Sequence, residues 1–333
     1  MKNNSLGIGL IGCGGYARLN LEALVRAKGL HLAAAFDLEP ARARETCSKY
    51  GGKPVASLVE LLRSPEVDAV IVSTPNRQHC QDALAALDAG KHVFVNIPVT
   101  LSSAEARRMI ERARTCDRVL MAGANHRKNP AVLALQATLK SGAIGVPHQL
   151  QASVSSPTAY KLPPGSWRAA AQEAPLLPFS QMGIIALEVA LMLWGPPATV
   201  SAFIAKRDAP TATPDIGTVI AKYADGRIFS LACSYVAYKS YWVTFAGPLG
   251  TATWDRIDAN SLRVVTDAGE VRTPYESKDE QLDELHDLRD CILHHREPDA
   301  GAECIYNLAE FYRAIGESIE TGAAARFAPW AGL

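Results

Sequence analysis

The stretch LGIGLIGCGGYA, residues 6–17, decides the fold of this chain. Its first six residues form an apolar run of strand length, and the glycine-rich residues 12–15 end that run. Apolar residues then recur at helical spacing, at Ala17, Leu21, Leu24 and Val25. The sequence therefore predicts a strand, a tight turn and a helix in direct succession.

The glycine turn fits the pattern G-x-G-x-x-A, with Gly12, Gly14 and Ala17 at the fixed positions. Gly12 permits the tight turn, Gly14 lets the backbone approach a pyrophosphate, and Ala17 is small enough for the helix to pack on the strand. The N–H groups at the start of a helix attract phosphates. We therefore expect a dinucleotide to contact Gly12, Gly14, Gly15, Tyr16 and Ala17.

An acidic residue follows the second predicted strand, residues 32–36. Asp37 lies 25 residues after Gly12, where a carboxylate accepts hydrogen bonds from the ribose hydroxyls of NAD. The same carboxylate repels the 2′-phosphate of NADP. Arg42 and Arg44 lie nearby in the sequence and keep NADP open as a cofactor. The pattern favours NAD.

Strand and helix signals alternate up to residue 123, which is typical of a parallel sheet covered on both faces. After this point, strand signals joined by short turns dominate and indicate antiparallel hairpins. These strands are predicted at residues 148–155, 199–205, 216–223, 227–235, 241–247, 250–255 and 261–266. Helices are predicted at residues 181–194, 280–295 and 301–321.

These patterns predict an α/β protein of two domains, in agreement with a length of 333 residues. Residues 1–125 are expected to form an N-terminal Rossmann dinucleotide-binding domain. Residues 126–333 are expected to form a C-terminal α/β domain with an open, mainly antiparallel sheet and C-terminal helices.

Composition excludes several classes of function. The 34 basic and 34 acidic residues cancel, which argues against nucleic acid or an anionic membrane as the main partner. No apolar run reaches the roughly 18 residues of a membrane span. The seven cysteines are scattered without metal-binding spacing, so we expect reduced thiols, no metal site and a cytoplasmic location.

Several short motifs beyond the glycine turn are similar to those of one protein family. They are Ser73-Thr74-Pro75-Asn76 with His79, residues 85–93, Arg127 with Pro130, residues 141–145, Trp167-Arg168 and the turn from Gly247 to Thr251. Together they resemble the Gfo/Idh/MocA family of NAD(P)-dependent oxidoreductases. The resemblance implies a small-molecule substrate and a homo-oligomer, a dimer or tetramer, formed through the C-terminal sheet. It also implies that the cofactor is lined by Thr74, Pro75, Asn76 and His79.

Two positions depart from the pattern of that family. The family usually carries a catalytic lysine in Glu-Lys-Pro, where this chain reads Asn96-Ile97-Pro98. A second signature, Asp-x-Gly-x-His-x-x-Asp, supplies the usual proton-carrying histidine. Here that signature runs from Gln181 to Glu188, with Ile185 at the histidine position. We expect Asn96 to contact the cofactor, and we expect Gln181 and Ile185 to contact the substrate.

Loss of both proton carriers should impair ordinary polyol oxidation, because general acid–base catalysis contributes roughly 10²–10⁴-fold in rate. Three interpretations follow. The protein is a redox enzyme for a sugar-derived or natural-product intermediate that needs no such help, for example an iminium or conjugated acceptor. Alternatively, it is a lyase-type or isomerase-type enzyme that retains NAD. In the third interpretation, it is a catalytically idle NAD-binding partner protein.

Other side chains are candidates for the missing acid and base. His126 and Lys128 follow the last Rossmann strand, Tyr160 and Lys161 lie in a proline-rich loop, and Tyr235, Tyr238 and Lys239 lie on a strand and its turn. Arg127 and Arg168 are candidates for binding the substrate. Arg168 could bind a carboxylate or phosphate group of the substrate. A structural role remains open for each of these residues.

Overall fold

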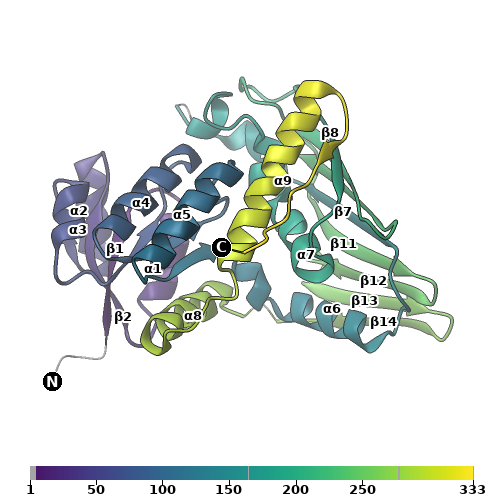
Figure 1. The fold of residues 1–333 in the computed structure, drawn as a ribbon, viewed down its shortest axis with the longest axis horizontal. Helices are drawn as coiled ribbons and strands as arrows, with labels where there is room; N and C mark the ends of the chain where they lie inside the picture. The colour runs from purple at the N-terminus through teal and green to yellow at the C-terminus, as the bar shows by residue number, and fades with distance from the viewer. Residues whose placement is uncertain (1–4, 164, 277, 333) are drawn as a thin grey trace. The chain divides into compact units, whose positions relative to one another are not determined.

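The computed structural model describes residues 5–163, 165–276 and 278–332, and the chain divides into two compact units (Figure 1). The first unit contains the residues up to Asn125 together with Asp279–Tyr306. The second contains His126–Lys278 and Asn307–Ala331. No helix within the described ranges is long and apolar enough to cross a membrane.

A six-stranded sheet forms the centre of the first unit, and all of its paired strands are parallel. The strands are β1 (Leu6–Ile11), β2 (Leu30–Phe36), β3 (Lys53–Pro54), β4 (Ala69–Val72), β5 (His92–Asn96) and β6 (Leu120–Gly123). Their order is β3-β2-β1-β4-β5-β6, so the direction of winding reverses between β1 and β4. Ligands of open α/β sheets bind beyond the carboxyl ends of the strands at such a reversal. The Rossmann prediction is confirmed.

Helices connect these strands, and two of them start with a capping serine. The connecting elements are α1 (Ala17–Leu24), α2 (Pro40–Tyr50), α3 (Leu58–Arg63), the short 3₁₀ turn η1 (Asn76–Gln78), α4 (His79–Asp88) and α5 (Ser103–Thr115). At the starts of α3 and α5, the hydroxyl oxygens of Ser57 and Ser102 accept hydrogen bonds from the backbone N–H groups of Glu60 and Glu105. Each serine thus satisfies one of the unpaired donors at the start of a helix.

Helix α8 (Glu280–His294) belongs to the first unit, although the sequence places it in the C-terminal domain. Its predicted apolar stripe exists, and Leu285 and Leu288 are buried in one core with Leu21 and Leu24 of α1. The domain boundary at residue 125 therefore needs a correction, because the chain returns to the Rossmann core after residue 278. Helix α9 (Ala302–Thr321) begins in the first unit and continues in the second.

The second unit is built on a nine-stranded sheet of order β14-β13-β12-β11-β7-β10-β9-β8-β15. Its strands are β7 (Gln149–Ser155), β8 (Thr199–Ala205), β9 (Ile216–Lys222), β10 (Ile228–Ser234), β11 (Ser240–Gly247), β12 (Gly250–Asp255), β13 (Ser261–Thr266), β14 (Gly269–Pro274) and β15 (Ala325–Arg326). Only β7 and β10 pair in parallel among these described strands. The predicted open, mainly antiparallel sheet is confirmed.

Helices cover one face of this sheet. Helix α6 (Pro130–Ser141) packs on β12 and β13, and α7 (Ile184–Trp194) packs on β7. Every second residue of β7 is buried, at Leu150, Ala152 and Val154, as expected for a strand with one covered face. Asn129 caps α6, because its side-chain oxygen accepts hydrogen bonds from the N–H groups of residues 131 and 132.

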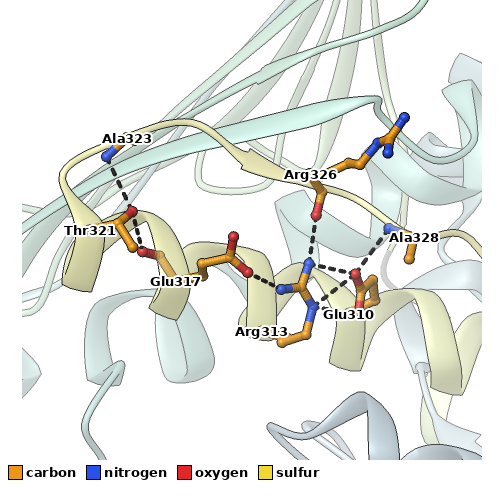
Figure 2. A network of polar contacts seen from close by, with 7 residues as sticks. All are labelled: Glu310, Arg313, Glu317, Thr321, Ala323, Arg326 and Ala328. Carbon is orange, nitrogen blue, oxygen red and sulfur yellow. Dashed lines mark hydrogen bonds and ion pairs between the residues drawn. The ribbon is translucent and has the colours of Figure 1, made fainter.

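A polar network fastens the end of the chain to α9 (Figure 2). The Glu310 carboxylate accepts hydrogen bonds from the Arg313 guanidinium at 2.9 Å and from the backbone N–H of Ala328 at 2.9 Å. Arg313 also donates to the backbone carbonyl of Arg326 and to Glu317. These contacts hold β15 in place, where it pairs with β8 and covers that edge of the sheet.

Two local features differ from the predicted elements. The helix expected from residue 181 starts as an α-helix only at Ile184, because Pro178–Gly183 forms a π-helical turn, labelled η5. Three strands have no counterpart among the predicted elements: β14 and the two-residue strands β3 and β15. Every residue of β14 is exposed, so this strand has no alternation of buried and exposed positions to detect.

Candidate functional site

Gly12 makes the turn between β1 and α1. Its φ is +88°, a left-handed conformation that favours glycine. A Cβ atom added there would lie 2.9 Å from the backbone of Ser73 and of Thr74. A side chain at this position would therefore strain the turn.

Gly14 and Gly15 have a different role from Gly12. A Cβ atom added at either of them would meet no described atom within 4 Å. No described side chain caps the start of α1, where Tyr16 is the N-cap residue. The open space and the uncapped N–H groups form a cradle that fits the pyrophosphate of a dinucleotide.

We expect Gly14→Ala to leave the fold intact and to weaken NAD binding at least about tenfold, which corresponds to about 1.4 kcal/mol. The added methyl group would occupy the open space that the pyrophosphate needs. Gly12→Ala is the matched control, because strain and clashes there should lower the free energy of unfolding by about 1–3 kcal/mol. Thermal unfolding and NAD calorimetry of both variants test this contrast. Unchanged NAD affinity in Gly14→Ala would contradict the assignment of the cradle.

Asp37 joins the glycine turn to the end of β2. Its Oδ2 accepts a hydrogen bond from the Cys13 N–H at 2.8 Å, and its Oδ1 accepts one from the Glu39 N–H at 2.9 Å. Each carboxylate oxygen keeps a further acceptor site, which fits a ribose hydroxyl. Arg42, a candidate partner for a 2′-phosphate, forms an ion pair with Glu39 at 2.9 Å.

His79 connects two loops at the carboxyl edge of the sheet. Its Nε2 lies 2.8 Å from the Thr74 carbonyl oxygen, and its Nδ1 lies 2.9 Å from that of Pro98. Burial lowers the pKa of His79, and the hydrogen bonds to the backbone carbonyls partly oppose this effect. The structure thus gives His79 a positioning role, because both ring nitrogens face protein atoms.

The loop after β4 retains a group suited to a ligand. The Thr74 hydroxyl donates to Asp82 Oδ2 at 2.7 Å. Asn76 is buried, and its side-chain Nδ2 has no hydrogen-bond partner among the described residues. An unpaired buried donor is costly, so this amide fits a cofactor oxygen. Pro75 lies between these two residues, and its contact with the cofactor stays a prediction.

Asn96 is held by protein contacts. Its Oδ1 accepts a hydrogen bond from Asn20 at 3.0 Å, and its Nδ2 donates to the Ser73 hydroxyl at 2.7 Å. Asn20 was not predicted, although it lies on the inward face of α1, where a polar residue is unusual and could have been noticed. The next residue, Ile97, is half-buried and offers no proton.

In the second unit, a buried carboxylate joins two neighbouring basic residues. Glu188 of α7 is fully buried and contacts both His126 Nε2 and the Arg127 guanidinium, with Arg127 Nε 2.5 Å from Oε1. Burial alone would raise the pKa of Glu188, but the charges and hydrogen bonds of His126 and Arg127 hold it well below its ordinary value. This trio fastens η2 (Asn125–Lys128) to α7.

The trio changes the interpretation of two sequence candidates. His126 is completely buried, and its Nδ1 has no hydrogen-bond partner among the described residues. Its contact with Glu188 favours a positioning role, and His126 as the replacement base stays a prediction. Arg127 is turned toward Glu188, which assigns it to positioning as well. Lys128 is half-buried, and its role as an acid or base stays a prediction.

Most of the other acid–base candidates lie on the surface. Tyr160 is exposed and donates to Asp208, and this hydrogen bond raises the pKa of the tyrosine, which disfavours its deprotonated form. Tyr238 is 88% exposed, and Lys161 and Lys239 are also exposed. All four side chains are therefore accessible to solvent, and their role as acid or base stays a prediction.

Arg168, Gln181 and Tyr235 are brought together by three separate segments. Arg168 lies in the 3₁₀ turn η4 (Trp167–Ala169), and its Nε donates to Gln181 Oε1 at 2.8 Å. Burial raises the pKa of Tyr235, although the charge of Arg168 partly opposes this effect. Ile185, four residues after Gln181, is half-buried. Within the described ranges, no group of His, Cys, Asp and Glu side chains is arranged to hold a metal ion.

Comparison with known proteins defines the class to which these features belong. Residues 6–124 match the oxidoreductase-family domain with an NAD-binding Rossmann fold, and residues 132–271 match the GFO/IDH/MocA C-terminal domain. This is an oxidoreductase architecture with an NAD-binding domain. The chain belongs to the Gfo/Idh/MocA family.

Individual relatives are similar mainly over part of their length. Myo-inositol 2-dehydrogenase of Thermotoga maritima is 34% identical over 151 residues, which are 45% of this chain and 45% of that protein. D-apiose dehydrogenase of Paraburkholderia graminis is 27% identical over 69% of this chain and 61% of its own length. The chain spans less than half the length of the first curated relatives that it matches.

Solved structures with a similar fold cover nearly the whole chain. Levoglucosan dehydrogenase in complex with NADH and L-sorbose has a TM-score of 0.90 and 19% identity, over 98% of this chain and 99% of its own. An oxidoreductase from Agrobacterium radiobacter in complex with NAD+, L-tartaric acid and magnesium has a TM-score of 0.83 and 21% identity, over 97% and 98%. At these identities the likeness shows the fold alone.

Proposed function

We propose that this protein is an NAD-dependent oxidoreductase for a small sugar-derived or natural-product molecule, and that it works without the usual lysine and histidine of its family. The observation that carries the proposal is the pairing of an open cradle at Gly14 and Gly15 with isoleucine at positions 97 and 185. The first feature supports a bound dinucleotide. The second supports a reaction that needs little proton transfer.

The described residues fit NAD in four ways. The cradle would bind the pyrophosphate, and Asp37 would accept hydrogen bonds from the ribose hydroxyls. The unpaired Asn76 amide would donate a hydrogen bond to the cofactor. His79 and Asn96 hold the loops that present these groups. Bound NAD would supply the hydride acceptor, and NADH the hydride donor. The Asp37 carboxylate favours NAD over NADP because it would repel a 2′-phosphate.

Isoleucine at positions 97 and 185 restricts the chemistry that the protein can perform. Both side chains are apolar, so they bind by contact and exclude water but neither accept nor donate a proton. Oxidation of a hydroxyl group requires a base, whereas an iminium or strongly conjugated acceptor is already activated for hydride addition. Reduction of such an acceptor is therefore the reaction that these residues favour.

A test of this function compares NAD and NADP directly. The purified protein is incubated with NADH or NADPH and a panel of sugar-derived and conjugated carbonyl or imine compounds, and nicotinamide absorbance is followed. Turnover with NADH and weaker turnover with NADPH is the expected result. Product formation without a net change in absorbance would indicate a lyase or isomerase. Cofactor binding without any turnover would indicate a partner protein.

We propose that the protein forms a homo-oligomer through its C-terminal sheet and works in the cytoplasm. Phe203, Ile220 and Ile228 are 70%, 44% and 44% exposed on the neighbouring strands β8, β9 and β10. A second copy would cover these apolar side chains. Among the described residues, all seven cysteines are free, which fits a reducing compartment. Sedimentation analysis measures the oligomeric state.

A further inference from the structure

Arg168 is half-buried and has no acidic partner. It donates one hydrogen bond, from Nε to Gln181 Oε1 at 2.8 Å, and its guanidinium lies 4.4 Å from the ring centroid of Trp167. In the described part of the chain, no Asp or Glu forms an ion pair with it. A guanidinium carries five N–H donors in a fixed fork. Four of them are therefore unused by the protein.

The missing counter-ion is unusual for a charge in this environment. Burial lowers the pKa of Arg168, which means that its surroundings solvate the positive charge poorly. The Trp167 ring compensates for part of this effect through its π-electrons. Gln181 orients the guanidinium but is neutral, so it leaves the positive charge intact. An anion bound at the unused N–H groups would supply the compensation that the chain lacks.

The surroundings of Arg168 narrow the chemistry of such an anion. Tyr235 is buried, and its hydroxyl makes no hydrogen bond with any described residue. Trp167, Met182 and Tyr235 pack in one apolar cluster. No second cation contributes to the pKa of Arg168. The site therefore offers one positive charge, one hydroxyl donor and an apolar wall.

We propose that Arg168 and Tyr235, with Gln181 as a positioning residue, form a seat for a carboxylate group of the substrate. A carboxylate is planar and accepts two parallel hydrogen bonds from the guanidinium fork. Its single negative charge matches the single cation of the seat, and the carbon atoms next to it would contact Trp167 and Met182. The inference rests on the proposed function in taking the bound molecule to be the substrate.

A matched pair of ligands tests the seat. D-glucuronate and D-glucose differ in one carboxylate, and their binding to the NAD-loaded protein is measured by calorimetry, with acetate as the minimal competitor. We expect glucuronate to bind about ten- to a hundredfold more tightly than glucose, the range for hydrogen bonds to a charged group. Arg168→Gln should abolish this preference. Equal binding of the two sugars, without competition by acetate, would overturn the proposal.

Variants at position 181 test whether the positive charge of Arg168 binds the carboxylate, and they leave Arg168 itself in place. Gln181→Glu would place a carboxylate beside the guanidinium and should abolish the preference while Arg168 remains. Gln181→Met adds no charge and should reduce the preference only in part. Arg263→Gln, at an exposed residue paired with Glu270, is the surface control. A preference for glucuronate that survives Gln181→Glu would contradict the seat, even if Arg168→Gln fails to fold.

These results separate the seat from the proposed function. Carboxylate binding that depends on Arg168, without any nicotinamide turnover, would support the seat and contradict the oxidoreductase. Turnover of neutral compounds, with no carboxylate preference that depends on Arg168, would contradict the seat and leave the oxidoreductase standing.

Discussion

Glu188→Gln is expected to lower the free energy of unfolding by about 3–5 kcal/mol, the usual cost of breaking a buried ion pair from one side. Glu188 is fully buried, and both His126 and Arg127 depend on it as their acidic partner. The amide of glutamine keeps the shape of the side chain but removes the charge. Arg127 would then lose its ion pair with Glu188, and one of the two basic residues would face the amide NH2 group instead of an oxygen acceptor.

The pH dependence identifies the charge as the cause. The pKa of Glu188 is held below its ordinary value in the folded protein, so the unfolded chain takes up a proton first as the pH falls. The stabilisation is fully present above the unfolded value of about 4.3 and is lost as the pH falls from there toward the lowered value. The wild type should therefore approach the stability of Glu188→Gln in acid.

Urea unfolding of both proteins over a pH series measures this difference. Glu270→Gln is the control, because its ion pair with Arg263 is exposed and should contribute less than about 1 kcal/mol. A difference between wild type and Glu188→Gln that stays constant from neutral to acidic pH would show that shape, and not charge, stabilises the contact.

The architecture was predictable because its signals are local and periodic. The apolar runs that became β1, β4 and β5 alternate with helices, and short turns separate the later strands. Helix α8 shows the limit of such signals. Its apolar stripe indicates that one face is buried, but Leu285 and Leu288 do not reveal that they pack on the first unit. That information lies in contacts between distant parts of the chain.

The site was predictable where glycine is required by the backbone. Gly12 and Gly14 occupy the positions that the dinucleotide pattern assigns to them, and the structure gives each its own physical reason. The roles of His79 and His126 were not predictable. The partners of His79 are backbone carbonyls, which every residue carries, and the burial of His126 depends on Glu188, 62 residues further along the chain. A sequence shows neither the partners nor the burial.

Ile97→Lys combined with Ile185→His is expected to raise NAD-dependent oxidation of neutral polyols by roughly 10²–10⁴-fold, the usual contribution of general acid–base catalysis. Both isoleucines are half-buried, so a polar side chain at either position can reach solvent or a ligand. Each single variant should give a smaller gain, because groups that act together in one proton transfer are not additive.

Polyol oxidation by the double variant should increase as the pH rises through the ordinary histidine pKa of about 6.5, because a neutral imidazole is the form that accepts a proton. Initial rates of NADH formation from myo-inositol and levoglucosan, over a pH series, measure both effects. Val59→Lys combined with Leu293→His is the matched control, since those apolar residues are exposed on α3 and α8. A double variant that folds and binds NAD but oxidises no polyol would mean that these two isoleucines are not the only obstacle to polyol oxidation. Restoring the two proton carriers alone would then not recover the chemistry of the family.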